Sequence, residues 1–211
     1  MQLEKAAADF IAQAKVKPAF LGYNGYKNIL CTSVNNEVVH CPPSTRSLTD
    51  GDIISIDAGV IVNDMYSDCA VTVPVGQVSP DAKKLIEVTR TSLYDIAKAQ
   101  IKPGNTIGDI GHAIELYVQQ HSYSVVRQLV GHGIGRHLHE EPSIPNYGRA
   151  HSGATLQPGM AIAVEPMVNI GGPDVVFEDE WRVVTSDGTL SAHFEHTFLV
   201  TDSGCEVLTQ L

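Results

Sequence analysis

The 211-residue sequence has no apolar run near the roughly 20 residues that a membrane span needs. Residues 1–5 lead into a mixed segment and not into the apolar core of a signal peptide. Positive charge is also scarce. Fourteen Lys and Arg stand against 24 Asp and Glu, and the net charge of −10 argues against nucleic acid as the main ligand. The sequence therefore predicts a protein with no membrane association and without nucleic acid as its main ligand.

The four cysteines lack the spacing of a disulfide framework or a zinc ribbon. Cys31, Cys41, Cys69 and Cys205 form no CxxC pair. Free thiols in a reducing cytoplasm are therefore expected, which predicts a cytoplasmic protein. The length and the hydrophobic content of 43% are typical of one domain, or of two tightly fused halves, with a packed core.

The periodicity predicts helices and strands in each half of the chain. Apolar residues recur at helical spacing over residues 3–15. Ser79-Pro80 starts a second helix that ends before Pro103-Gly104, and Thr106 with Asp109 caps a third. Strands are expected in the following segments: residues 29–39, broken at Asn35-Asn36, then 53–61, 66–73, 124–130 and 160–165, and a hairpin of 181–185 with 191–201 around Asp187-Gly188.

Four carboxylates lie inside or at the end of apolar strand-like runs: Asp57, Asp68, Glu165 and Glu195. Isolated charges in such places are costly, so we expect a cation among them. A turn centred between Val62 and Asn63 would make Asp57 and Asp68 direct cross-strand partners, with Cβ atoms about 5 Å apart. In a different register Asp68 would face solvent. Asp57 lies in the middle of an apolar run, which favours the cation.

A glycine-rich stretch over residues 131–142 contains His132 and His139. Its three glycines let the backbone pass close to another group at His132. A lone histidine is more often structural, but the four carboxylates favour a ligand role, and one imidazole with four carboxylates is a hard divalent-metal site. His40 by itself reads as a loop histidine. The aromatic and glycine residues 20–26 are equally consistent with a turn packed on the core and with an aromatic wall.

Together these residues resemble type I methionine aminopeptidases, from about Leu3 to the C-terminus. The resemblance is most specific in residues 131–142, 162–167 and 191–197. It implies the α/β pita-bread fold, with two pseudo-symmetric halves and an antiparallel sheet covered by helices, as a single catalytic metallopeptidase domain over residues 1–211. It begins after the family's first helix, so a short form is expected.

The resemblance also implies roles for the residues of the site. Asp57, Asp68, His132, Glu165 and Glu195 would hold two divalent ions, with Co, Mn, Fe(II) or Zn as candidates. Asp68 and Glu195 would bridge the two ions. Glu165 would also move protons. The further implied residues are the catalytic histidines His40 and His139 and the methionine pocket of Tyr23, Tyr26, Cys31, Leu138 and Trp181, with Phe20 and Met167 nearby.

The resemblance predicts removal of the N-terminal methionine of nascent proteins when the second residue is small. A monomer with transient ribosome association is expected. One departure is His40-Cys41-Pro42-Pro43, where the family usually has His-Gly-Ile-Pro. The alternatives are a proline-specific aminopeptidase or prolidase, which usually carries a large N-terminal domain, and a non-catalytic pita-bread protein, which typically lacks ligands. The spacing from His132 to Glu195 leaves no room for the insertion of type II enzymes.

Overall fold

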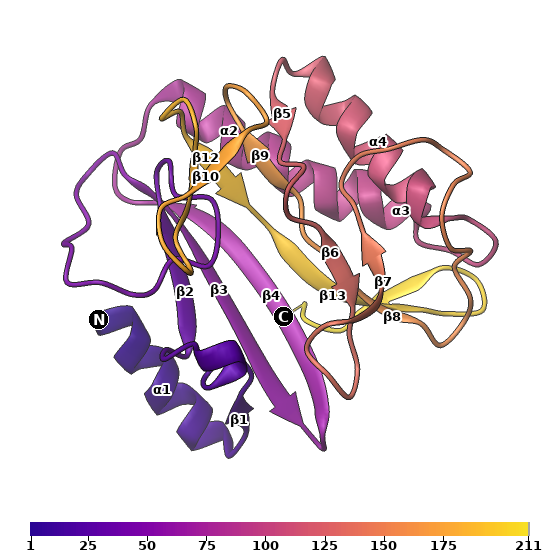
Figure 1. Ribbon diagram of the computed structural model, residues 1–211, viewed down its shortest axis with the longest axis horizontal. Helices are drawn as coiled ribbons and strands as arrows, with labels where there is room; N and C mark the ends of the chain where they lie inside the picture. The colour runs from indigo at the N-terminus through magenta and orange to yellow at the C-terminus, as the bar shows by residue number, and fades with distance from the viewer. Residues whose placement is uncertain (211) are drawn as a thin grey trace.

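The structure, a computed structural model, describes residues 1–210 of the chain. Its centre is a nine-stranded antiparallel sheet with the path β1-β3-β4-β13-β8-β6-β7, on which β2 pairs with β3 and β14 with β13 (Figure 1). The strands of this sheet are β1 Lys17–Pro18, β2 Leu30–Val34, β3 Ile53–Val62, β4 Met65–Pro74, β6 Gly131–Gly133, β7 Glu140–Ile144, β8 Ala161–Val164, β13 Glu195–Val200 and β14 Cys205–Val207.

The expected register of the β3–β4 hairpin is wrong by one position of the turn. Val62 pairs with Met65, so the turn is centred between Asn63 and Asp64, which have φ angles of 50° and 62°. A two-residue hairpin turn with positive φ at both positions favours Asn and Asp, whereas Val62 is β-branched and disfavours that conformation.

As a result, Asp57 pairs with Ala70 and Asp68 pairs with Gly59. The two aspartates are diagonal neighbours and not direct partners. They still share a face of the sheet, because the register moves by an even number of residues.

Helices cover the opposite face of this sheet, as Figure 1 shows. Ser79 caps α2 Pro80–Thr91 by accepting a hydrogen bond from the Ala82 amide at 3.1 Å, and Thr106 and Asp109 form the expected capping box of α4 Ile107–Gln120. Between them lie a π-helical segment, η2 Ser92–Ala97, and α3 Lys98–Gln100. Their apolar stripes meet the sheet in a core whose largest fully buried members include Leu85, Leu93, Ile110, Ile114, Ile162 and Phe198.

Two strand predictions in the C-terminal half are wrong, one in its length and the other in its partners. Residues 124–130 form only the short β5 Ser124–Val125, because the chain leaves its neighbours after Val126 and enters the large sheet at β6. The hairpin of 181–185 with 191–201 does not form. Instead β11 Val183–Thr185 pairs with β10 Val175–Phe177, and β12 Ser191–His193 pairs with β9 Met167–Asn169. A period of two identifies a strand but not its partner.

The N-terminal helix α1 Gln2–Ala14 lies at the edge of the sheet beside β2 and buries Ile11 (Figure 1). The Glu4 carboxylate accepts hydrogen bonds from the backbone amides of Ile29 at 2.8 Å and Leu30 at 3.1 Å, and so fixes the start of β2. The short 3₁₀ turn η1 Tyr23–Gly25 lies in the segment that connects α1 to β2. No helix in residues 1–210 is long and apolar enough to span a membrane. The four cysteines, all described, are unpaired.

Candidate metal centre and active site

Five side chains from both halves of the chain meet on the face of the large sheet opposite the helices. Glu195 on β13 pairs with Ala70 on β4, and Ala70 pairs with Asp57 on β3. Glu195 and Asp57 therefore lie on either side of Ala70, on the same face of the sheet. Asp68 lies two residues before Ala70 and points to the same side. His132 comes from β6 and Glu165 from the residue directly after β8. The junction of β4 and β13 therefore joins the two halves at this site.

The spacing of these groups suits a common ligand. One side-chain donor atom each of Asp68, His132 and Glu195 lies within 4.8 Å of the others. His132 Nε2 is 3.7 Å from Glu165 Oε1. All five side chains are buried, Glu195 most deeply at 2% exposure. Such separations are too long for hydrogen bonds, but they leave room for a cation between the groups.

The carboxylates lack the partners that buried charges require. Asp57 Oδ1, Asp68 Oδ1 and Glu195 Oε1 have no hydrogen-bond donor within residues 1–210. Burial, followed by repulsion from Asp68, raises the pKa of Asp57, Glu165 and Glu195 well above their ordinary values, and burial raises that of Asp68 to about 7. A divalent cation would relieve both costs, so the donor set fits a hard metal ion.

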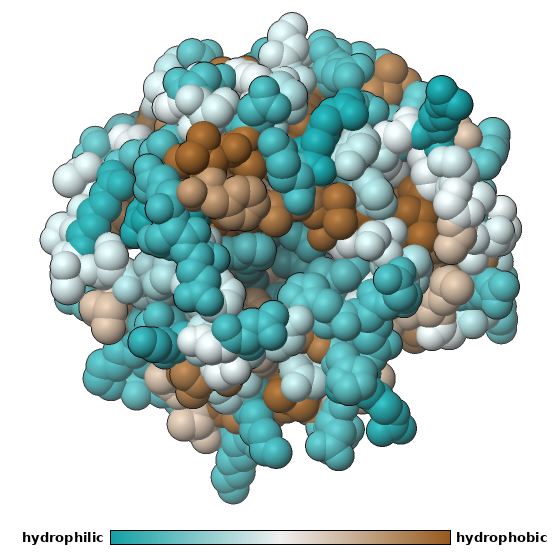
Figure 2. Space-filling model, viewed as in Figure 1, coloured by the Kyte–Doolittle hydropathy of each residue, from teal (hydrophilic) through white to brown (hydrophobic). Residues whose placement is uncertain are grey.

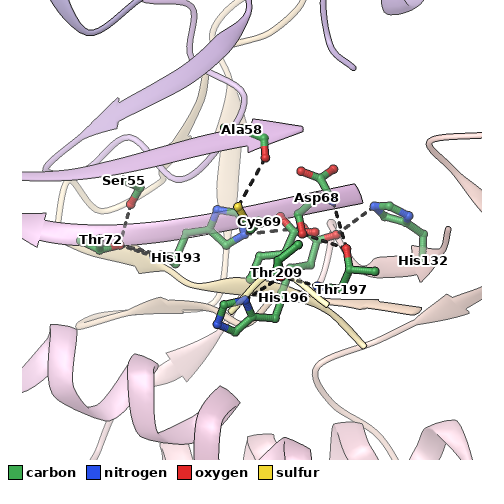
Figure 3. A network of polar contacts seen from close by, with 12 residues as sticks. Ser55, Ala58, Asp68, Cys69, Thr72, His132, His193, His196, Thr197 and Thr209 are labelled. Carbon is green, nitrogen blue, oxygen red and sulfur yellow. Dashed lines mark hydrogen bonds and ion pairs between the residues drawn. The ribbon is translucent and has the colours of Figure 1, made fainter. Parts of the chain in front are cut away.

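The orientation of His132 is fixed by its own strand. Nδ1 lies 2.8 Å from the Gly133 carbonyl oxygen, so Nδ1 carries the proton, and the Nε2 lone pair faces Glu165 Oε1 at 3.7 Å (Figure 3). The expected close approach at the flanking glycines is confirmed. A Cβ on Gly131 would lie 2.3 Å from the Ala163 carbonyl oxygen, and one on Gly133 would lie 2.4 Å from that of Glu141. Glycine therefore lets β6 lie close to its neighbours and places His132 between them.

Two supporting residues were not found from the sequence. The Thr197 hydroxyl accepts a hydrogen bond from the Asp68 amide at 3.0 Å and donates one to the Asp68 carbonyl at 2.9 Å, which joins β13 to β4 at the site (Figure 3). The side-chain amide of Asn146 donates a hydrogen bond to the backbone carbonyl of Glu165 at 3.0 Å. Thr197 lies two residues after Glu195 on one strand, and that spacing is a signal for a shared face. No sequence signal marks Asn146.

A cavity of about 290 Å³ opens on the five groups, and Figure 2 shows the hollow near the centre of this face. All seven residues expected around the substrate line it. Phe20, which was expected nearby, also lines it, and so does Asn24. Met167, also expected nearby, is instead fully buried in a separate cluster with Val38 and Val39. The seven expected residues are Tyr23, Tyr26, Cys31, His40, Leu138, His139 and Trp181.

The apolar wall of the cavity is aromatic. The ring centroids of Tyr26 and Trp181 are 4.9 Å apart in an edge-to-face arrangement, and the Tyr26 hydroxyl donates to the Leu30 carbonyl at 2.8 Å. Cys31 and Leu138 are buried in the same cluster. The wall is therefore rigid and apolar, with its single buried hydroxyl already used by the backbone.

Two further histidines reach the polar side of the cavity. His139 Nδ1 is 2.6 Å from the Tyr23 hydroxyl, and its ring centroid is 4.2 Å from that of His132. His40 has a φ of 63°. The Cys41 side chain that follows it is fully buried, with Sγ 3.5 Å from the Val39 carbonyl. Burial, followed by repulsion from His139, lowers the pKa of His40 to about 4, and burial, followed by repulsion from His132, lowers that of His139 to about 4. Both rings are therefore neutral at neutral pH.

Comparisons with known proteins agree with this geometry. Residues 1–202 match the model of metallopeptidase family M24. Methionine aminopeptidase 1 of Bacillus subtilis (strain 168) is 49% identical over 211 residues, which cover 100% of this chain and 85% of that protein. A methionine aminopeptidase structure from Thermotoga maritima gives a TM-score of 0.97 at 46% identity, over 100% of this chain and 85% of that one. The prolidase from Pyrococcus furiosus is similar in fold alone, with a TM-score of 0.66 at 23% identity over 85% of this chain and 49% of that one.

Proposed function

The chain belongs to metallopeptidase family M24 and, within it, to the type I methionine aminopeptidases, and on that premise we propose how its residues remove an N-terminal methionine. In this proposal Asp57, Asp68, His132, Glu165 and Glu195 hold two divalent ions. The observation that carries it is the cluster of buried, unpartnered carboxylate oxygens at the floor of an aromatic cavity.

The metal pair is supported by the number and kind of donors. Four carboxylates offer more oxygen atoms than one ion needs as ligands. Carboxylates with one imidazole suit Mn, Fe(II) or Co, and they differ from the thiolate ligands of a zinc-thiolate site. When bound, such a pair of ions acidifies a water molecule that attacks the scissile carbonyl. Asp68 and Glu195, which lie on the neighbouring strands β4 and β13, would belong to the set that holds the ions.

Glu165 is the proposed proton carrier. Its carboxylate lies beside His132 at the floor of the cavity. One of its oxygens takes a proton from the attacking water and returns it to the leaving amine.

His139 is the proposed donor to the substrate carbonyl. Its Nδ1 accepts a hydrogen bond from the Tyr23 hydroxyl in this assignment, so the neutral ring carries its proton on Nε2. With its proton on Nε2, the ring would donate a hydrogen bond that stabilises the negative charge developing on the substrate carbonyl oxygen.

The shape of the cavity supports specificity for methionine followed by a small residue. An unbranched thioether suits a wall of Tyr26, Cys31, Leu138 and Trp181, because it bends to fill an irregular apolar space. His40 lies on the polar side, where it would contact the nitrogen of the second residue and exclude a bulky side chain. Ribosome association, a monomeric state and a cytoplasmic location stay predictions.

A peptide series tests the proposed specificity. Purified protein is loaded with Mn(II) and supplied with Met-Gly, Met-Ala, Met-Val, Met-Leu and Met-Lys peptides, and free methionine is measured. We expect rapid release from the first two and little from the last two. Comparable rates across the series would contradict the role given to His40 in excluding a bulky second residue. Cleavage of Xaa-Pro peptides without a methionine preference would favour the prolidase alternative, and binding of peptide without any cleavage would favour the non-catalytic one.

A further inference from the structure

His193 is a buried histidine beneath the metal centre, and the proposed mechanism gives it no role. It is the last residue of β12 and only 2% exposed. Its backbone is held on both sides by one side chain. The amide donates to Thr72 Oγ1 at 2.8 Å, and the same hydroxyl donates to the His193 carbonyl at 2.7 Å. Ser55 Oγ in turn lies 2.8 Å from Thr72 Oγ1 (Figure 3). The backbone of His193 is therefore fixed to β3 and β4, the strands that carry Asp57 and Asp68.

The ring of His193 faces two of the proposed ligands. Nε2 is 3.8 Å from Glu165 Oε2 and 4.0 Å from Glu195 Oε2. It has no hydrogen-bond partner within residues 1–210. A buried ring nitrogen without a partner is costly, and here two acceptors lie about 1 Å beyond hydrogen-bond distance.

The surroundings determine which nitrogen of His193 carries the proton. A neutral imidazole has one N–H and one lone pair, and a lone pair directed at two carboxylate oxygens is repelled by both. Nε2 therefore carries the proton. His132 has the opposite tautomer, because its Nδ1–H donates to the Gly133 carbonyl and leaves Nε2 as the lone pair. The two rings approach the Glu165 carboxylate from different oxygens, His132 at Oε1 and His193 at Oε2.

We propose that His193 is a positioning residue whose Nε2–H would donate a hydrogen bond to Glu165 Oε2 in the metal-loaded protein. This inference rests on the proposed roles of Glu165 and Glu195. With Oε2 held by His193 and Oε1 beside His132, the carboxylate is fixed in one orientation for both metal binding and proton transfer. Partners of this kind, one step removed from the metal, typically change metal affinity or activity by about 10–100-fold when lost.

Two variants separate a hydrogen-bond donor from a space-filling ring. His193→Leu removes the donor at similar volume, and His193→Gln keeps an N–H donor without an imidazole. Mn(II) affinity is measured by isothermal titration calorimetry, and kcat and KM on a Met-Ala-Ser peptide. For His193→Leu we expect Mn(II) affinity to fall about 10–100-fold, with kcat reduced and KM little changed. His193→Gln should recover most of both losses.

Two results would overturn the proposal. One is a His193→Leu protein with wild-type Mn(II) affinity and kcat. The other is a His193→Gln protein as impaired as His193→Leu, because the imidazole would then act as a ligand and not as a donor. If His193→Leu does not fold, the wild type still decides the question. The ¹⁵N spectrum of its histidines in the Mg(II)-loaded protein should show His193 protonated at Nε2, and protonation at Nδ1 would contradict the donor role.

A failure of the proposed role of His193 can be told apart from a failure of the proposed function. If the metal-loaded wild type released no methionine, or if Glu165→Gln kept full activity, the proposed mechanism would fail. The tautomer of His193 and the metal affinities of the two variants would still be measured independently of turnover.

Discussion

Asp57, Asp68 and Glu195 each keep an oxygen that no hydrogen-bond donor within residues 1–210 reaches. Such an arrangement is unfavourable unless a cation is present, because the groups repel one another and have lost their water. The same property that makes the site costly in the metal-free protein would favour the binding of divalent ions. Burial of these carboxylates is therefore the reason to expect a divalent cation at the centre.

The first prediction concerns His139. His139→Ala should bind metal as the wild type does and lose about 10²–10³-fold in kcat, because one donor to the developing negative charge is removed. Tyr23→Phe should cost less. This variant leaves the His139 ring in place and removes the Tyr23 hydroxyl that lies 2.6 Å from His139 Nδ1. Without that hydroxyl, the proton of the ring is no longer held on Nε2. Release of methionine from Met-Ala-Ser and Mn(II) titration measure the two effects.

The ranking of the two variants is the sharp part of this prediction. A His139→Ala protein with wild-type turnover would show that the histidine is not a donor in the reaction. A Tyr23→Phe protein more impaired than His139→Ala would show that the tyrosine acts on the substrate directly.

At the residue scale, the sequence predicted much of the site. Asp57 and Glu165 stand out because they interrupt or close apolar strands, and the glycines mark His132. Asn146 carries no such signal, because an asparagine in a loop is common and only the fold brings it to the Glu165 carbonyl. Side chains that act through the tertiary structure are not visible in local patterns.

At the scale of elements, strands were easier to predict than their partners. The β3–β4 hairpin was expected, but its turn lies one residue later, since Asn63 and Asp64 accept positive φ and Val62 does not. The C-terminal hairpin was wrong because β11 pairs with β10, which the sequence pattern did not identify as a strand. Pairing depends on contacts between distant segments, and local periodicity does not report them.

The second prediction concerns β6, the strand that carries His132. Gly131→Ala would place a Cβ 2.3 Å from the Ala163 carbonyl oxygen of β8, so the strands must separate. We expect a loss of about 1–3 kcal/mol in the free energy of unfolding. Mn(II) affinity should also be weaker, because His132 moves with its strand. Urea unfolding and calorimetric titration measure these changes.

Gly204→Ala is the matched control, since a Cβ at that glycine meets no atom within 4 Å. It should leave both quantities close to the wild type. If Gly131→Ala were as stable as Gly204→Ala and bound Mn(II) equally well, the close packing of β6 against β8 would not be what positions His132.

At the scale of the whole molecule, the site joins the two halves of the chain. Asp57 and Asp68 come from the N-terminal half, and His132, Glu165 and Glu195 from the C-terminal half, with β4 and β13 in contact between them. A ligand that binds the native state and not the unfolded chain stabilises the fold. Metal binding should therefore stabilise the whole chain and not only a loop around the site.

The third prediction is a pH dependence of the metal-free protein. Burial raises the pKa of all four carboxylates, that of Asp68 to about 7, so the native state holds protons that the unfolded chain has released. This stabilisation is complete below the ordinary carboxyl pKa and is lost as pH rises through the raised values. Burial lowers the pKa of His193 to about 3 and that of His40 to about 4, so these rings contribute mainly below pH 6.5.

Above pH 6.5 the carboxylates therefore determine the slope. The Tm of protein treated with EDTA should fall between pH 6.5 and 8.5, measured by calorimetry. Saturating Mn(II) should remove or reverse the fall, because metal binding requires the ionised carboxylates and strengthens as pH rises. Glu195→Gln should flatten the slope of the metal-free protein, since one buried charge is gone. A Tm that rises with pH in EDTA would contradict the strain assigned to the four carboxylates.

The central claim is that this chain is a metal-dependent enzyme specific for N-terminal methionine. The most direct measurement follows methionine release from Met-Ala-Ser, with Leu-Ala-Ser as the control, while EDTA-treated protein is titrated with Mn(II). The account predicts no turnover without metal, activity that rises as the ions bind and levels off when both sites are filled, and negligible cleavage of Leu-Ala-Ser. Turnover of Met-Ala-Ser by the metal-free protein, or equal cleavage of both peptides, would contradict it.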